Sequence, residues 1–265
     1  MAARTPEPDF RARTVRALLL SRELDHNRRR VGLSTRQAAS GMDMSPAMLN
    51  RVMTGRRLPT ALEVGGLCAL FDVPAERRPV LYALAREGDR TQWLTHHDPG
   101  DPDRFAVLRE LHAVAESITG YDTATLPLAL RTADYHRAVL AATGAAPTAR
   151  GPDRVEAYTA HYVHAHALRA PWVDPAVMTA QLARLRDDRR LRVLPDRTPP
   201  PAAHPFQVIT TRHFPPVVFF DLGAATLLLE LDAAAPHLAA LRAVERGALS
   251  VGETRAFLDD LLFSR

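Results

Sequence analysis

Arginine and asparagine side chains near the N-terminus have the chemistry needed to bind nucleic acid. A guanidinium group binds phosphate oxygens or the edge of guanine, and a side-chain amide binds the edge of adenine. Asn50 and Arg51 lie within one short segment, and Arg56 and Arg57 follow it after a glycine. The pattern predicts base or phosphate contacts from Asn50 and Arg51, and phosphate contacts from Arg56 and Arg57. Solvated surface side chains are the alternative for both pairs.

The basic charge of the chain is concentrated at the same end. Residues 1–60 contain 12 Arg and 5 acidic residues, a net charge of +7. The formal net charge of the whole chain is +4, so the remaining residues together carry −3. A basic module joined to a mildly acidic body is typical of proteins that neutralise backbone phosphates with one end.

Short helices must position these side chains. Apolar residues recur at helical spacing over residues 14–31, and Gly32 is expected to end this first helix. Ser34 is expected to cap a second helix that runs from Thr35 to about Ser40, and Gly41 would permit the turn after it. The N-terminus of this second helix can hold a phosphate through its backbone N–H groups, although Ser34 fits a purely capping role better.

A third helix follows the turn. Ser45 is expected to cap it, Pro46 suits its first position, and Gly55 is expected to end it. Its core-facing residues are expected to be Met48, Leu49 and Val52. Two short capped helices around a tight turn are the geometry that places the second of them, the recognition helix, in the major groove. The residues expected to contact DNA are Ser34, Thr35, Arg36, Ser45, Ala47, Asn50, Arg51, Arg56 and Arg57.

The segments GLSTRQAAS, MSPAMLNRVMTGRRLPT and LCALFDVP together resemble the five-helix Xre-type, or lambda-repressor-like, helix-turn-helix domain. The resemblance covers about residues 14–74 and implies binding to double-stranded DNA. Pro46 and Ala47 stand where this family often has polar, base-reading side chains, and Asn27 replaces a usual core leucine. Specificity is therefore expected to depend more on Asn50, Arg51 and DNA shape.

Beyond this module the pattern changes from helical to mixed. The expected division is a flexible tail over 1–12, the helix-turn-helix domain over 13–87, a polar linker over 88–103 and an α+β domain over 104–265. In the last domain, helices are expected over about 105–118, 126–142, 177–188, 237–246 and 250–262, a loop over 144–153, and about five short strands between them. The fold class is thus mainly α with an α+β C-terminal domain, in which helices cover a small sheet.

The C-terminal domain also resembles a known family. Residues 126–140, PAVMTAQL, RVLPD and the region from VVFFDL to FLDDLL are similar to the C-terminal domain of actinobacterial Xre regulators described as antitoxin-like, the WhiJ type. PLALRT stands where that family commonly has Pro-Gly-Leu-Leu-Gln-Thr. The resemblance implies a regulator often encoded beside a small acidic partner protein, with no established enzymatic activity.

Histidines are the one feature of the sequence that suggests metal or catalytic chemistry. In a strand, His164 and His166 would share a face and could bind zinc or nickel, with His161, His204 and His213 elsewhere in the chain. No carboxylate or cysteine in this pattern completes the set, and structural histidines are the favoured interpretation. Glycine-rich phosphate loops, a Gly-x-Ser-x-Gly elbow and His-Glu-x-x-His are all missing from the sequence. No enzyme activity, metal or cofactor is therefore expected.

The sequence also bounds location and assembly. It has no apolar run of roughly 18 residues and no apolar stretch near residue 1, so neither a membrane span nor a signal peptide is expected. Cys68, the only cysteine, excludes an internal disulfide and is expected to be a buried apolar residue rather than a redox sensor. These features predict a cytoplasmic location. A homodimer is also expected, because one small helix-turn-helix reads too short a DNA site.

Two functions remain open from the sequence. The first is a sequence-specific DNA-binding transcription regulator with a C-terminal sensor or dimerisation domain. The alternative is an antitoxin-like interaction module that mainly binds a small acidic partner protein, with DNA binding secondary.

Overall fold

The chain divides into two compact units, seen here in a computed structural model. The first, the helical unit, runs to Thr91 and includes His213–Pro215, and the second, the sheet unit, comprises Gln92–Arg212 and Pro216–Arg265. The structure describes residues 14–98, 101, 103–144, 158–200, 202 and 204–264. The tail expected over 1–12 and most of the loop expected over 144–153 lie outside these residues.

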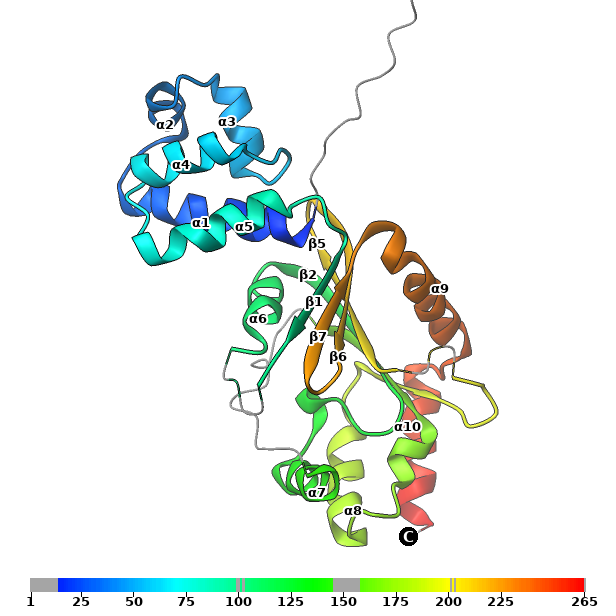
Figure 1. Cartoon of the computed structure of the whole chain (residues 1–265). Coiled ribbons are helices and arrows are strands. Elements are labelled where there is room, and N and C mark those ends of the chain that lie inside the picture. The colour runs from blue at the N-terminus through cyan, green and yellow to red at the C-terminus, as the bar shows by residue number, and fades with distance from the viewer. Residues whose placement is uncertain are drawn as a thin grey trace, which may run out of the picture. The chain divides into compact units, whose positions relative to one another are not determined.

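Among the described residues, five α-helices form the helical unit, as the resemblance implies (Figure 1, blue to cyan). They are α1 (Val15–Arg30), α2 (Thr35–Gly41), α3 (Pro46–Met53), α4 (Ala61–Leu70) and α5 (Arg78–Arg86), with a 3₁₀ turn over Ala75–Arg77 before α5. The first four each begin after a Ser or Thr whose side chain accepts a hydrogen bond from a backbone N–H in the first turn. These caps satisfy donors that have no partner inside the helix, which explains why the helices begin where they do.

The core of the helical unit contains apolar side chains from all five helices. Fully or almost fully buried are Leu20, Leu24, Ala38, Ala39, Leu49, Val52, Val64, Leu67, Cys68, Phe71 and Leu81. Asn27 is buried too, and its side-chain amide donates to the Glu23 carbonyl at 2.9 Å. That bond satisfies part of the buried polar group.

Two expectations for this unit are wrong in detail. Met48 does not face the core: its side chain is 41% exposed, because the inward face of α3 is formed by Leu49 and Val52, one helical turn apart. The turn after α2 has its left-handed residue at Asp43, with φ of 50°, rather than at Gly41. Gly41 instead permits close packing, since a Cβ there would lie 3.2 Å from Cδ1 of Leu70 on α4.

In the part of the sheet unit that the structure describes, a mixed seven-stranded sheet forms the centre. Its strand order is β1-β7-β6-β5-β2-β3-β4. The strands are β1 (Gln92–His96), β2 (Ala115–Asp122), β3 (Tyr158–His164), β4 (Leu191–Leu194), β5 (Phe206–Thr211), β6 (Phe214–Asp221) and β7 (Ala225–Leu229). β2, β3 and β4 are parallel neighbours, whereas β2 with β5, β6 with β7, and β7 with β1 are antiparallel.

Helices cover both faces of this sheet. They are α6 (Ala106–His112), α7 (Ala133–Thr143), α8 (Pro175–Leu185), α9 (Leu231–Gly247) and α10 (Val251–Phe263), with 3₁₀ turns over Leu128–Leu130 and Ala165–Arg169. In Figure 1, α9 lies along one face and α6 along the other. The alternation of side chains along β6 agrees with this arrangement. Val218 and Phe220 belong to the core that includes α9, whereas the ring of Phe219, on the other face, contacts Phe105 just before α6.

The sheet has two more strands than the sequence predicts. Residues 92–96, expected within a linker, form β1, and the second half of the helix expected over 105–118 belongs to β2. The 3₁₀ turn that begins at Ala165 ends β3 before His166, so His164 and His166 do not share a strand face. Strand pairing explains the difference at β2, because β3 and β5 satisfy its backbone on both sides.

Candidate functional site

The residues predicted to contact DNA lie mostly on the exposed surface of α2, α3 and the turn after α3. Seven are exposed, namely Ser34, Arg36, Ser45, Ala47, Asn50, Arg51 and Arg56, whereas Thr35 and Arg57 are half-buried. We call these nine residues the recognition surface. Leu49 and Val52 anchor α3 in the core, so Asn50 and Arg51 project from its outer side.

The two serines of the recognition surface act as helix caps. Ser34 Oγ accepts from the Gln37 amide at 3.2 Å, and Gln37 Oε1 accepts from the Ser34 amide at 2.9 Å. Ser45 Oγ accepts from the Met48 amide at 3.2 Å. These bonds, which are reciprocal at α2 and single at α3, fix the N-termini of the two helices, and they account for both serines without any bound ligand.

The arginines after α3 differ from each other. Arg57 forms an ion pair with Glu63 at 2.9 Å, and Glu63 also accepts from the Thr60 amide at 2.7 Å. Burial would raise the pKa of Glu63, but the bonds from Arg57 and Thr60 outweigh it and hold the pKa below its usual value. Arg56 is exposed, and no ion pair to it is found in the described part of the chain. Arg56 therefore presents a more available cation than Arg57.

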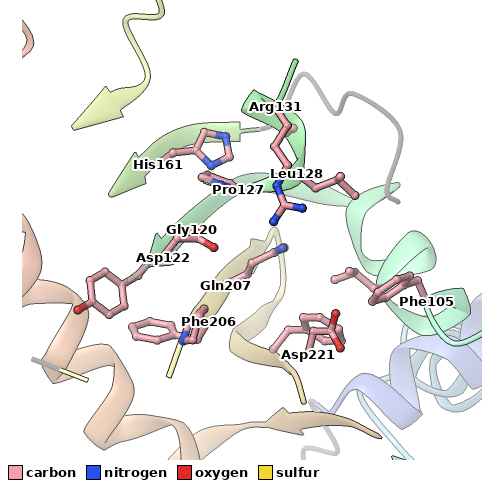
Figure 2. A pocket seen from close by; sticks show the side chains of 15 residues that line it. Phe105, Gly120, Asp122, Pro127, Leu128, Arg131, His161, Phe206, Gln207 and Asp221 are labelled. Atoms are coloured by element: carbon pink, nitrogen blue, oxygen red, sulfur yellow. The ribbon is translucent and has the colours of Figure 1, made fainter. Parts of the chain in front are cut away.

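A pocket of about 170 Å³ opens in the sheet unit at the end of β2 (Figure 2). Its polar lining comprises Asp122, Arg131, His161, Gln207 and Asp221, and its apolar walls include Phe105, Leu108, Leu128 and Phe219. Figure 2 shows the guanidinium of Arg131 directed into the pocket, toward the side chain of Gln207. The one sequence signal near this pocket is the PLALRT run, which contains Arg131.

The ionisable groups of this pocket have shifted pKa values. Burial raises the pKa of Asp122 to about 7, and the attraction of Arg131 offsets this only partly. Burial also lowers the pKa of His161 to about 4, with Arg190 acting in the same direction. Asp122 and His161 are therefore easier to keep neutral than ordinary side chains of their kind. Perturbed groups in a cleft are a common feature of binding and catalytic sites.

The expected histidine pair does come together, and a carboxylate joins it. His166 Nδ1 lies 2.7 Å from His164 Nδ1, and Asp196 Oδ1 lies 3.7 Å from the same His164 atom. The three form the only group of this kind with metal-ligand spacing among the residues that the structure describes. His164 Nε2–H donates to the Thr198 carbonyl at 3.2 Å, and Asp196 also pairs with Arg169. Protein contacts thus account for His164 and Asp196. His161 lies apart from them, in the pocket.

Cys68 is buried within α4, and burial raises the pKa of its thiol. A thiol held in the protonated form is a poor nucleophile. This environment matches the apolar role expected for it.

In the part of the chain that the structure describes, no helix is long and apolar enough to cross a membrane.

Family comparisons address both units. Residues 19–81 match a helix-turn-helix domain family, and the matched segment covers α2, α3, α4, most of α1 and the first turn of α5. Residues 105–260 match a family described as a domain of unknown function, DUF5753. No curated protein and no solved structure matches the chain. The helix-turn-helix match supports a DNA-binding regulator. Since the second match spans more than half of the sequence, the chain belongs to the DUF5753 family and carries an N-terminal helix-turn-helix domain.

Proposed function

We propose that this protein is a sequence-specific transcription regulator that binds double-stranded DNA through the recognition surface. The observation that carries the proposal is the exposed outer side of α3, where Asn50 and Arg51 project from a helix that caps and core residues hold in place. An amide and a guanidinium on such a helix have the donors and acceptors needed to read base edges. The +7 charge of residues 1–60 supports phosphate binding around them.

The sheet unit is proposed to act as a sensor and dimerisation domain of the antitoxin-like, WhiJ type, without catalysis of its own. The pocket at the end of β2 supports a sensing role, because it combines charged groups with apolar walls. Dimerisation would double the DNA site, so the operator should contain inverted half-sites. Light scattering at micromolar concentration tests this directly, and a monomer both with and without DNA would contradict it.

The alternative role, capture of a small acidic partner protein, has a specific electrostatic consequence. Residues 104–265 carry 18 Arg and 17 acidic residues and are almost neutral, whereas the excess positive charge lies in residues 1–60. An acidic partner would therefore be attracted to the same end as DNA. Under this alternative, the partner should compete with DNA, and Arg51→Ala and Arg56→Ala should weaken both complexes.

Genome-wide mapping of binding sites tests the proposed function. The regulator is expected to occupy a limited set of sites that share a motif with inverted half-sites. Asn50→Ala should abolish enrichment at these sites without lowering the amount of protein in the cell. Occupancy that follows no sequence motif would contradict the proposal and favour the partner-binding alternative.

A further inference from the structure

The pocket of the sheet unit contains a cation that its surroundings only partly satisfy. Arg131 Nε donates to the Leu126 carbonyl at 2.7 Å, and Nη2 donates to Thr125 Oγ1 at 3.2 Å. Nη1 lies 3.3 Å from His136 Nδ1. All three partners are neutral or only weakly basic groups, and no carboxylate of the described residues lies within 4.0 Å of the guanidinium. Each terminal nitrogen also retains a second N–H.

The protein holds this arginine rigidly in place. Gln181 on α8 is fully buried, and its side chain donates to the Leu130 carbonyl at 2.9 Å and accepts from the Thr132 amide at 2.6 Å. The backbone is therefore clamped on both sides of Arg131. Burial lowers the pKa of the guanidinium, and an anion close to it would offset this desolvation. A preorganised, desolvated cation that points into a cavity favours binding of an anion.

The other charged groups of the pocket leave room for an anion. Asp221 already pairs with Arg104. With its pKa raised to about 7, Asp122 is partly protonated at pH 7 and mostly protonated at pH 6, so it repels an anion less than an ordinary carboxylate and can donate a hydrogen bond when protonated. Gln207 Oε1 accepts from His112 Nε2–H at 3.1 Å. This bond directs the amide nitrogen of Gln207 away from His112, and the side chain extends toward Arg131 (Figure 2).

The size and walls of the pocket limit the rest of the ligand. A cavity of about 150 Å³ accommodates benzene, so the volume of about 170 Å³ suits one ring or a short branched chain. The rings of Phe105 and Phe219, 6.4 Å apart between centroids, form an apolar wall beside the polar groups. From these observations we propose that the pocket binds a small organic acid whose carboxylate pairs with Arg131 and whose apolar part packs against Phe105, Leu108 and Phe219.

This inference deepens the proposed sensor role and rests on it for its biological meaning. Calorimetric titrations of the full-length protein at about pH 6 test the binding itself. The probes are isovalerate, benzoate and phenylacetate, each compared with its primary amide, which has almost the same shape but no charge. At least one acid should bind about tenfold more tightly than its amide, because a charge-assisted pair with Arg131 forms only with the carboxylate.

Variants separate the pocket from other cationic surfaces. Arg131→Gln should weaken binding of that acid about tenfold or more and remove the preference for acid over amide. Gly120→Ala keeps every charge but places a Cβ 3.3 Å from His161 Nδ1 and 3.8 Å from Asp122 Oδ2, so it should also weaken binding. Arg137→Gln, an exposed position on α7, is the matched control and should change nothing. Circular dichroism establishes that each variant is folded.

The inference is overturned if no acid binds better than its amide, or if Arg131→Gln and Arg137→Gln bind the acid equally well. DNA affinity, measured without any acid, is a separate readout. A protein that binds DNA but no acid loses only this inference, whereas a protein that binds the acid but no DNA loses the proposed regulator function.

Discussion

At the scale of single residues, the two arginines after α3 show how neighbouring, identical side chains acquire different roles. Arg57 is held by Glu63, whose second oxygen completes the cap of α4. Arg56 is exposed. Loss of Arg57 would leave Glu63 half-satisfied, whereas loss of Arg56 would remove only a surface charge.

Arg56→Ala and Arg57→Ala should therefore differ in stability and in DNA binding. Arg57→Ala should lower the free energy of unfolding by about 1 kcal/mol, because a partly buried, charge-assisted hydrogen bond is lost. Arg56→Ala should leave stability unchanged but weaken operator and random DNA equally and reduce the salt dependence of binding by roughly one unit. Urea unfolding and salt titrations measure the two effects. Equal stability of both variants would contradict the structural role of Arg57.

Asp122 predicts a pH dependence of stability. Its pKa of about 7 in the folded protein lies above the usual value of 3.8, so folding favours the protonated form. The contribution of this group to stability is complete below about pH 4 and is lost as the pH rises toward and through 7. Asp122→Asn cannot ionise. The stability of this variant minus that of the unmodified protein should therefore rise by about 2 kcal/mol as the pH rises from about 5 to 8. The partial exposure of Asp122 limits this rise.

The control for this measurement is Asp260→Asn, at an exposed position on α10. Urea unfolding at several pH values should show a constant difference between this variant and the unmodified protein. If Asp122→Asn also shows a constant difference, Asp122 has an ordinary pKa and the electrostatic account of the pocket is wrong.

At the scale of helices and strands, the helices were more predictable than the strands. Local signals mark a helix: Ser34 and Ser45 act as caps as expected, and apolar spacing identified α1 and α5. Local signals are insufficient for β1 and β2, because their hydrogen-bond partners lie far away in the sequence. Residues 105–118 have helical spacing, and only pairing with β3 and β5 turns the later ones into a strand.

The same difference between local and long-range interactions determines which parts of the candidate sites could be predicted. The recognition surface depends on one short, locally determined segment, so the exposure of Asn50, Arg51 and Arg56 follows from the helix pattern. The pocket combines residues from α6, β2, β3, β5 and β6 and from the segment before α7. No local pattern links Asp122 to Arg131 or Gln207. Asp196 likewise joins His164 and His166 only in the folded chain.

The packing of α2 against α4 predicts a large effect of a small change. A side chain at Gly41 would meet Leu70, the Cβ alone approaching Cδ1 within 3.2 Å. Gly41→Val should therefore destabilise the helical unit by about 1–3 kcal/mol through overpacking and weaken DNA binding in proportion to the unfolded fraction. Gly252→Ala on α10 is the control: a Cβ there meets nothing within 4 Å, and the change should slightly stabilise the protein. Thermal unfolding compares the two, and unchanged stability of Gly41→Val would contradict the close packing.

At the scale of the whole molecule, charge and family membership distinguish the two units. The helical unit contains the excess of arginine and matches a helix-turn-helix family. The almost neutral sheet unit carries the pocket and belongs to the DUF5753 family. A regulator of this kind needs DNA binding that depends on sequence, because charge alone gives only nonspecific binding. The proposed regulator function therefore depends on base reading by α3.

The most direct test is a titration of Asn50→Ala and Arg51→Ala against the mapped operator and a scrambled duplex at several salt concentrations. The control is Arg86→Ala, an exposed arginine on α5 outside the recognition surface. If α3 reads bases, the two α3 variants should lose roughly 1–3 kcal/mol on the operator and much less on the scrambled duplex, while the control binds both normally. Equal losses on the two duplexes, or none, would contradict base reading by Asn50 and Arg51.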